Sequence, residues 1–376
     1  MTQPAKARRI AVLLQSLEGG GAQRRMVELI NGFAASGRTI DLFLVDGQGE
    51  LREQLASNVR VLMLDRNAPA QSLADHLSTD PPDALLAGAA AVHAIAVKAV
   101  GQGPHIPLVL RASSHPLRTF PWIMVRQRLA EMQRRRARMR RYAAADLIIA
   151  VADDIAASIR QALPAAPIVV IRNPVITPSF LAGATAPVAL PWPEDPGIPL
   201  IVGVGRLAVA KDFPTLLRSF ALLRARRPAR LAILGSGTGR EIEHLQRLAR
   251  RLGIAGDFAL PGSVDHIAAW LRRADLFVSS SLWEGSAGAL IEALAMGCPV
   301  VATDCVGSAR DLLQHGRLGR LVPPRDPKAM AEAMAAELER PVDRALLAAA
   351  AEPYRAADQA SEYLAAIDAC LCRVKP

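Results

Sequence analysis

Two glutamates in the C-terminal half stand eight residues apart in the stretch WEGSAGALIEALAMGCPVVATD, which runs from Trp283 to Asp304. A glycine-containing turn separates Glu284 from Glu292, and an apolar run surrounds the second of them. Two carboxylates near one another can act as an acid and a base, can bind one polyhydroxylated ligand together, or can be ordinary surface residues. The elements that carry them narrow these three possibilities.

The stretch has the pattern of a strand, a loop and a helix. A buried strand is expected over Leu276–Ser279, and a helix is expected from near Ala287–Gly288 to about Met296, with Gly297 as its cap. Glu284 then lies before the helix, and Glu292 lies just past its first turn. Because the free N–H groups of a helix start attract an anion, this arrangement fits a ligand with sugar, phosphate and sugar in a row. Carboxylates are good acceptors for vicinal hydroxyls, as in the ribose contact of dinucleotide folds.

Basic and glycine-rich loops follow two other expected strands. Arg206 and Lys211 come after the strand Leu200–Val204, and a guanidinium and an ammonium at this spacing can bind one phosphate group together. The alternative is a pair of solvated cations. Gly20 and Gly21 belong to a three-glycine turn after the first strand, where the backbone can approach a ligand closely. That turn can equally be no more than a flexible connection.

Other motifs exclude some kinds of site. The run Gly235–Gly239 has the spacing GxGxG instead of GxGxxG, which predicts a tight turn near a ligand more than a site for NAD. No Asp-x-Asp motif occurs in the chain. The four cysteines lack the spacing of a disulfide framework or a structural zinc site, and they fit a reduced setting. The sequence therefore predicts neither a metal nor a redox cofactor.

The order of elements predicts an α/β fold with two domains. Short β-rich runs alternate with helical segments, which favours parallel sheets. We expect an N-terminal Rossmann-like domain on the acceptor side over 1–175, a proline-rich linker over 176–198, and a C-terminal Rossmann-like domain that binds the donor over 199–352. A last helix over 353–376 would cross back to the N-terminal domain. Two doubly wound domains that face each other across a cleft would place ligands at the carboxyl ends of their strands.

Composition bounds the partners and the location. The chain has 376 residues, is 51% hydrophobic and carries a formal charge of +10. The excess of positive charge predicts an anionic partner: a nucleotide, a nucleic acid or a membrane surface. Aromatic residues make up only 4%, which argues against nucleic acid. The apolar run Ile10–Leu14 is short for a secretory signal, so we expect a cytoplasmic protein, with peripheral association at the inner face of the membrane as a further possibility.

Taken in order from about Arg9 to Leu338, these parts resemble the retaining glycosyltransferases of family 4, which have the two-domain GT-B fold. Three stretches carry the resemblance, namely GVGRLAVAKDFPTLLRSFALL, LAILGSGTGREIEHLQRLARRLGI and DLFVSSSLWEGSAGALIEALAMGCPVVATD. The last contains the E-x7-E signature of that family in Glu284 and Glu292. The chain departs from the family where EGFG or EGLP is usual, because Glu284 is followed by Gly-Ser-Ala-Gly.

The resemblance implies a nucleoside-diphosphate sugar as donor, with UDP favoured, and a hydroxyl acceptor that could be lipid-linked. It implies transfer with retention, in cell-envelope glycan or glycolipid synthesis, with no cofactor and no metal. His115 would lie near the reacting carbon, with a structural loop histidine or a phosphate contact as the alternatives. Glu284 would hold hydroxyls of the donor sugar. The other donor contacts implied by the resemblance are Gly20, Gly21, Arg206, Lys211, Ser263, Val264, Ser286, Ala287, Gly288, Ala289 and Glu292.

Two rival functions share the fold or the ligand. A non-catalytic nucleotide-sugar-binding protein would be favoured by loss of Glu284 or Lys211, and both residues are present. A GT-B nucleotide-sugar epimerase has a different set of acids and lacks this glycine-rich region.

A basic segment over 117–141 predicts a membrane contact. The segment from Arg118 to Arg141 contains nine arginines and one glutamate, which gives a net charge of +8. Trp122 lies among apolar residues near the N-terminal end of this segment. An apolar head with a basic body, which includes Arg134, Arg135 and Arg136, suits an anionic lipid surface. The alternative is an ordinary helix that packs its apolar residues inward and leaves its arginines solvated.

Overall fold

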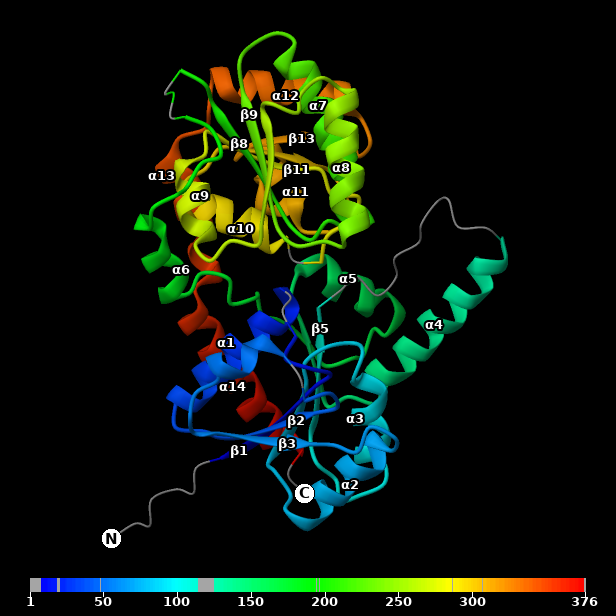
Figure 1. Cartoon of the computed structure of the whole chain (residues 1–376). Helices are drawn as coiled ribbons and strands as arrows, with labels where there is room; N and C mark the ends of the chain where they lie inside the picture. The colour runs from blue at the N-terminus through cyan, green and yellow to red at the C-terminus, as the bar shows by residue number, and fades with distance from the viewer. Residues whose placement is uncertain are drawn as a thin grey trace. The chain divides into compact units, whose positions relative to one another are not determined.

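The computed structural model divides the chain into two units (Figure 1). It describes residues 8–18, 21–47, 49–113, 125–193, 195, 197–285, 287–305 and 307–374, with the side chains of 125–131 and 374 outside the description. Unit 1 comprises Met1–Pro174 and Arg355–Pro376, and unit 2 comprises Val175–Tyr354. Each unit is an α/β domain built on a parallel sheet, which confirms the expected fold class.

Unit 1 contains a seven-stranded sheet in the order β3-β2-β1-β4-β5-β6-β7. Its strands are β1 (Arg9–Leu14), β2 (Thr39–Leu44), β3 (Val59–Met63), β4 (Ala84–Ala87), β5 (Leu108–Ala112), β6 (Leu147–Ala150) and β7 (Ile168–Val170). Its helices are α1 (Gly21–Ala35), α2 (Pro69–Thr79), α3 (His93–Val100), α4 (Val125–Ala143), α5 (Asp153–Ala162) and α14 (Ala356–Val374), with a 3-10 turn over Glu50–Gln54.

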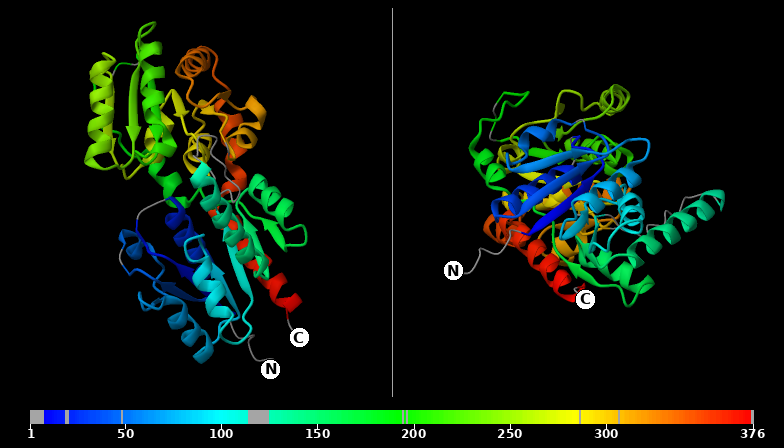
Figure 2. Two further views of the ribbon diagram at one scale, coloured as in Figure 1. Left: turned by 90° about the vertical axis from the view of Figure 1, so that its right-hand side faces the viewer. Right: turned by 90° about the horizontal axis from the view of Figure 1, so that it is seen from below.

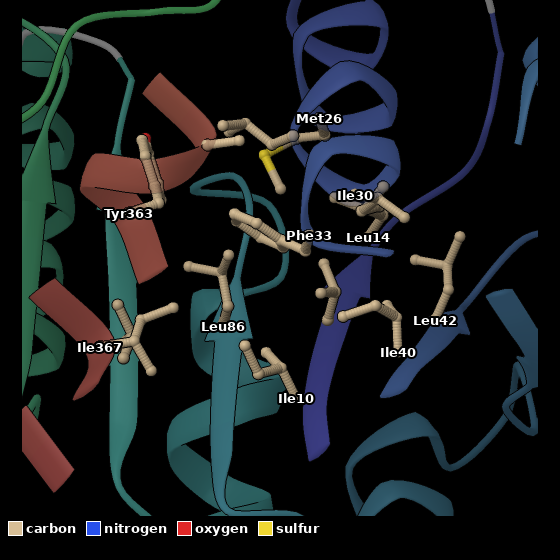
Figure 3. Close-up of a cluster of buried hydrophobic side chains, with 14 of the residues drawn as sticks. Ile10, Leu14, Met26, Ile30, Phe33, Ile40, Leu42, Leu86, Tyr363 and Ile367 are labelled. Carbon is tan, nitrogen blue, oxygen red and sulfur yellow. The ribbon is translucent and has the colours of Figure 1, made fainter. Parts of the chain in front are cut away.

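The strands of unit 1 are apolar on both faces because helices cover both faces. On β1, Ile10 and Val12 belong to one buried cluster and Ala11 and Leu13 to the other. Helices α1 and α14 cover the first face, where Phe33 of α1 packs near the ring of Tyr363 of α14 (Figure 3). The last helix of the chain is therefore part of the core of unit 1.

Unit 2 contains a six-stranded sheet in the order β10-β9-β8-β11-β12-β13. Its strands are β8 (Leu200–Val204), β9 (Arg230–Leu234), β10 (Phe258–Gly262), β11 (Leu276–Ser279), β12 (Val300–Thr303) and β13 (Arg320–Val322). Its helices are α6 (Pro178–Ala182), α7 (Phe213–Arg224), α8 (Gly239–Arg251), α9 (Ile267–Arg273), α10 (Gly288–Ala295), α11 (Ala309–Leu312), α12 (Pro327–Glu339) and α13 (Arg344–Ala351). Short 3-10 turns lie at Gly183–Thr185, Val209–Lys211, Gln314–Gly316 and Glu352–Tyr354.

Helices also cover both faces of the second sheet. Figure 1 shows α7 and α8 on one side and α9, α10 and α13 on the other. Local chemistry starts several of these helices: Thr238 and Glu241 form a capping box at α8, and the Asp326 and Asp343 side chains cap α12 and α13. The helix α10 has no side-chain cap.

The proline-rich stretch that we expected to be a linker packs within unit 2. Val175 is fully buried, and Val188, Leu190 and Trp192 pack against the same apolar cluster as α9 and α10. The Trp192 indole N–H also donates to the carbonyl of Gly256 across 2.7 Å. Pro178 begins the short helix α6 within this stretch, and the prolines do not prevent the segment from covering the core.

Helix α4 differs from the other helices of unit 1 because little of it is covered. Tyr142, near its C-terminal end, is buried against His93 of α3, whereas residues 132–136 are all exposed. Figures 1 and 2 show the N-terminal turns of α4 extending away from the sheet of unit 1.

In the described part of the chain, the structure contains no helix with the length and apolar character needed to traverse a bilayer.

Candidate functional site

The candidate site lies where the strand order of unit 2 changes direction. The chain proceeds from β8 outward to β9 and β10, then returns to place β11 on the other side of β8. The loops after β8 and β11 start side by side at the carboxyl edge of the sheet, and they lead to helices on opposite faces, α7 and α10. Such a switch point is where open α/β sheets bind their ligands. Arg206 and Lys211 follow β8, and Glu284 follows β11, so the strand order brings these expected residues to one place.

Two hydrogen bonds join the loops beneath the side chains. The amide of Leu282 donates to the carbonyl of Ala210 across 2.8 Å. The Ser280 hydroxyl donates to the carbonyl of Lys211 across 2.7 Å. These two bonds fix the main chain of Ala210 and Lys211 next to the residues that follow β11.

An ion pair completes the connection. Lys211 Nζ lies 2.6 Å from Glu284 Oε1, and the two side chains are only 22% and 12% exposed. The Ser281 hydroxyl donates to the same carboxylate oxygen across 2.5 Å. A largely buried pair needs such additional hydrogen bonds to offset the desolvation of its charges. An ammonium has three donors, so Lys211 retains donors beyond the one directed at Glu284.

Two glycines permit the close packing of this pair. Gly205 has φ +150°, and a Cβ at that position would lie 2.7 Å from Cε of Lys211. Gly307 has φ +133°, and a Cβ there would lie 2.6 Å from the carbonyl oxygen of Glu284. Both backbone conformations are in the region that favours glycine. A side chain at either position would displace one member of the ion pair.

Two neighbouring ionisable groups respond to burial. Burial raises the pKa of the Cys305 thiol to about 11, and the negative charge of Glu284 acts in the same direction. With this raised pKa, the Cys305 thiol is protonated at neutral pH and is not a thiolate nucleophile. Burial also raises the pKa of Asp212, which follows Lys211 and accepts a hydrogen bond from the Thr215 hydroxyl across 2.7 Å.

Helix α10 begins directly after the Glu284 loop. Ala287 is its N-cap in a left-handed conformation, with φ 45°, and Gly288 is its first residue. Ala289 packs against the core, and Glu292 lies in the second turn and is half-buried. The N-cap Ala287 makes no side-chain hydrogen bond to α10, and the positive end of the helix dipole at its first amides favours an anion.

The remaining expected donor residues lie in loops or at a helix start. Arg206 is exposed, and its guanidinium has no hydrogen-bond or ion-pair partner among the described residues. Ser263 is exposed just after β10, and Val264 packs against the core cluster of unit 2. Gly21 is the first residue of α1 in unit 1. Among the described residues of unit 2, Arg206, Ser263 and Val264 have no hydrogen bond or ion pair with Lys211 or Glu284.

Four expected site residues lie outside the described residues: Gly20, His115, Trp122 and Ser286. Arg134, Arg135 and Arg136 are described and are exposed on α4. Within the described ranges, no group of three or more His, Cys, Asp or Glu side chains is arranged to hold a metal ion.

Sequence reasoning missed three hydroxyl residues of the site. Ser280, Ser281 and Thr303 are each about 1% exposed. Their hydroxyls donate to the carbonyl of Lys211, to the carboxylate of Glu284 and to the carbonyl of Ser281, respectively. The signal was available in the run Ser279-Ser280-Ser281, because consecutive hydroxyls at the end of a buried apolar strand require internal partners.

Two family models match the chain, one in each unit. Residues 198–340 match the model described as Glycosyl transferases group 1, and residues 19–177 match the Glycosyltransferase Family 4 model. The two matches fall on successive parts of the chain, and the match over 198–340 takes in the loops after β8 and β11.

Curated relatives match part of the chain. A D-inositol 3-phosphate glycosyltransferase 2 of Catenulispora acidiphila is 41% identical over 162 residues, which is 39% of this chain and 38% of that protein. The lipopolysaccharide core biosynthesis mannosyltransferase LpsB of Rhizobium meliloti is 35% identical over 162 residues, which is 42% of this chain and 45% of that protein. The matched part thus spans less than half the length of these relatives.

Solved structures match the chain over nearly its full length. The Anabaena protein HepE, in complex with UDP and glucose, has a TM-score of 0.72 at 19% identity and covers 95% of this chain and 99% of its own. A glycosyltransferase from Rickettsia africae has a TM-score of 0.75 at 16% identity, with coverages of 97% and 99%. The fold is that of GT-B glycosyltransferases. Together with the two family models, it supports a GT-B glycosyltransferase as the class of this protein.

Proposed function

We propose that the protein transfers a sugar from a nucleoside-diphosphate sugar, with UDP favoured, to a hydroxyl acceptor with retention of the anomeric configuration. The observation that carries the proposal is the Lys211–Glu284 pair at the switch point between β8 and β11. A cation and a carboxylate fixed together at this edge match a ligand in which a diphosphate adjoins a sugar. The HepE structure that shares the fold holds UDP and glucose, and another, the outer core transferase WaaB, is a galactosyltransferase.

The proposed chemistry follows from charge. Breaking the anomeric C–O bond places negative charge on the departing diphosphate and positive charge on the sugar. Arg206, Lys211 and the first amides of α10 would stabilise the diphosphate, and fixed donors in a partly buried site do so without reorganising. Glu292 would bind the ribose hydroxyls and Glu284 the hydroxyls of the donor sugar. In this scheme protein groups neutralise the leaving group, so transfer requires no metal ion.

A donor panel tests the proposal. UDP-, GDP- and ADP-sugars would be scored for thermal stabilisation of the protein and for slow hydrolysis by mass spectrometry. We expect stabilisation and hydrolysis with UDP-sugars, since mass action stabilises a fold that binds its ligand. Stabilisation without hydrolysis or transfer would favour a nucleotide-sugar-binding protein instead. No stabilisation by any of the three classes would contradict the proposal.

We also propose that α4 docks on an anionic membrane surface, which would bring a lipid-linked acceptor to unit 1. Residues 132–136 are exposed, and three successive arginines, Arg134 to Arg136, lie in this part of the helix. Arg134, Arg138 and Arg141 line a shallow surface hollow of about 360 Å³ on the same helix. An exposed basic helix is the form that attraction to anionic headgroups requires. Cell-envelope glycan or glycolipid synthesis at the cytoplasmic face of the membrane is the setting that fits both proposals.

A further inference from the structure

Three buried hydroxyls surround the Lys211–Glu284 pair and have no part in the proposed chemistry. Thr303, the last residue of β12, donates from Oγ1 to the carbonyl of Ser281 across 2.5 Å. Ser280 donates to the carbonyl of Lys211, and Ser281 donates to the Glu284 carboxylate. The ends of β11 and β12 are thereby linked to both members of the ion pair.

Of these contacts, the one made by Ser281 reaches a charged side chain. Glu284 lies outside regular secondary structure, and Lys211 has a long flexible stem, so their ion pair by itself permits several geometries. Ser281 lies two residues after β11, its main chain accepts the hydrogen bond from Thr303, and its hydroxyl, in a side chain that is 1% exposed, shares Oε1 of Glu284 with Lys211 Nζ. Two donors that converge on one carboxylate oxygen from different directions restrict the rotation of that carboxylate.

We propose that Ser281 is a positioning residue for the donor sugar. It holds the Glu284 carboxylate, and through the shared oxygen the Lys211 ammonium, in the orientation that the sugar-diphosphate junction requires. Thr303 supports it by fixing the main chain of Ser281. This inference rests on the proposed function, because it takes Glu284 as the group that contacts the sugar. The nucleotide would keep its contacts with Arg206, Glu292 and the first amides of α10, so UDP affinity should depend on Ser281 only weakly.

A double-mutant cycle tests this role. Ser281→Ala, Glu284→Gln and the double variant would be compared by kcat and KM with the sugar donor selected by the panel, and by UDP affinity. We expect Ser281→Ala to lower kcat about tenfold or more while the dissociation constant for UDP changes less than about twofold. In the Glu284→Gln background the same substitution should have little further effect, since the group it positions has been altered. Ser281→Thr, which retains the hydroxyl, should recover most of the loss.

Ser219→Ala is the matched control. Ser219 is fully buried on α7 in the same unit, and its hydroxyl donates to the carbonyl of Thr215 across 2.9 Å. Both substitutions remove one buried hydroxyl, so thermal unfolding should report losses of similar size, whereas only Ser281→Ala should change kcat. Equal kinetic effects in the two variants, or additive effects in the cycle, would overturn the positioning role.

A second readout needs no donor. The chain has five lysines, Lys6, Lys98, Lys211, Lys328 and Lys375. Acylation of each by an amine-reactive ester can be followed by peptide mass spectrometry, with the exposed Lys98 and Lys328 as internal references. We expect Ser281→Ala to raise the relative rate at Lys211 several-fold, because the ion pair loosens, and Ser219→Ala to leave it unchanged. An unchanged rate would overturn the proposal for Ser281. If no sugar donor were hydrolysed or transferred, that result would count against the proposed function. The acylation rate of Lys211 would still decide whether Ser281 positions the ion pair.

Discussion

Arg111 of β5 donates a hydrogen bond from Nε to the Tyr363 hydroxyl of α14 across 3.1 Å, although 252 positions separate them in the chain. Both residues are buried, at 1% and 0% exposure. The guanidinium also donates to the carbonyl of Gly88 across 3.0 Å and to the side chain of Asn173. Burial raises the pKa of Tyr363, so its hydroxyl remains protonated. A buried cation is thus satisfied by neutral oxygens at the point where the last helix joins unit 1.

Removing that hydroxyl should loosen the C-terminal helix. Tyr363→Phe keeps the ring but leaves one buried N–H of Arg111 without its acceptor, a change that costs about 1–3 kcal/mol. Urea denaturation would measure the loss, and hydrogen exchange should increase along α14. In a cycle with Arg111→Met the two effects should not add, because each removes the same contact. Additive losses would show that the bond is incidental.

Lys211 should contribute directly to nucleotide affinity. Lys211→Ala is expected to weaken UDP binding by about 1–3 kcal/mol, the range for a charge-assisted hydrogen bond. Isothermal titration calorimetry would measure it, with Lys328→Ala as the control because Lys328 is an exposed lysine on α12 of the same unit. Equal affinity in the Lys211 variant and the parent would remove the phosphate assignment.

Transfer should survive removal of divalent metal ions. In the proposed scheme Arg206, Lys211 and the amides of α10 would neutralise the leaving group, so EDTA should leave the initial rate of transfer unchanged. Activity would be measured with EDTA and again after addition of Mg²⁺ or Mn²⁺. A complete loss that either ion restores would mean that a metal, not these side chains, carries the diphosphate charge.

His93 should make the stability of unit 1 sensitive to acid. Its ring is fully buried, and burial lowers its pKa from 6.5 to about 4, with the charges of Arg141 and Arg138 acting in the same direction. The unfolded chain therefore binds the proton more tightly. The stabilisation is complete above about pH 6.5 and is lost as the pH falls through about 4, a total of about 3 kcal/mol.

The variant His93→Leu cannot titrate and should lose less stability than the parent between pH 7 and pH 4.5. Denaturant unfolding at a series of pH values would show the difference. His105→Gln is the control, since His105 is an exposed histidine of the same unit. A parent and a His93 variant with the same pH slope would refute the assignment.

The membrane proposal predicts co-sedimentation with anionic vesicles that weakens as salt rises. Replacing Arg134, Arg135 and Arg136 with Gln should lower vesicle binding about tenfold or more, since each surface cation contributes about 1 kcal/mol. The matched control replaces three exposed arginines of unit 2, Arg240, Arg250 and Arg251, and removes the same charge. A parent protein that stays in the supernatant at low salt would leave a soluble acceptor as the better interpretation.

Several elements could be predicted from the sequence because their signals are local. The strand Leu276–Ser279 is predicted at its observed bounds, and the helix expected from near Ala287–Gly288 to about Met296 is observed as α10, Gly288–Ala295. An apolar run bounded by Gly and Pro fixes such an element whatever lies around it. The strand Arg320–Val322 was missed, since three residues flanked by Gly and Pro give too short a run to distinguish a strand from a loop.

The sequence by itself determined the residue types of the candidate site and their places at the ends of strands. Only the tertiary structure decided that Lys211 and Glu284, 73 positions apart, form one ion pair. Hydrophobic periodicity indicates that β8 and β11 exist, but not that β11 returns to lie beside β8. The role of Ser281 depended on the same packing. A serine at the end of a strand can donate to many acceptors, and the orientation of the Glu284 carboxylate in the folded loop selected the one that it uses.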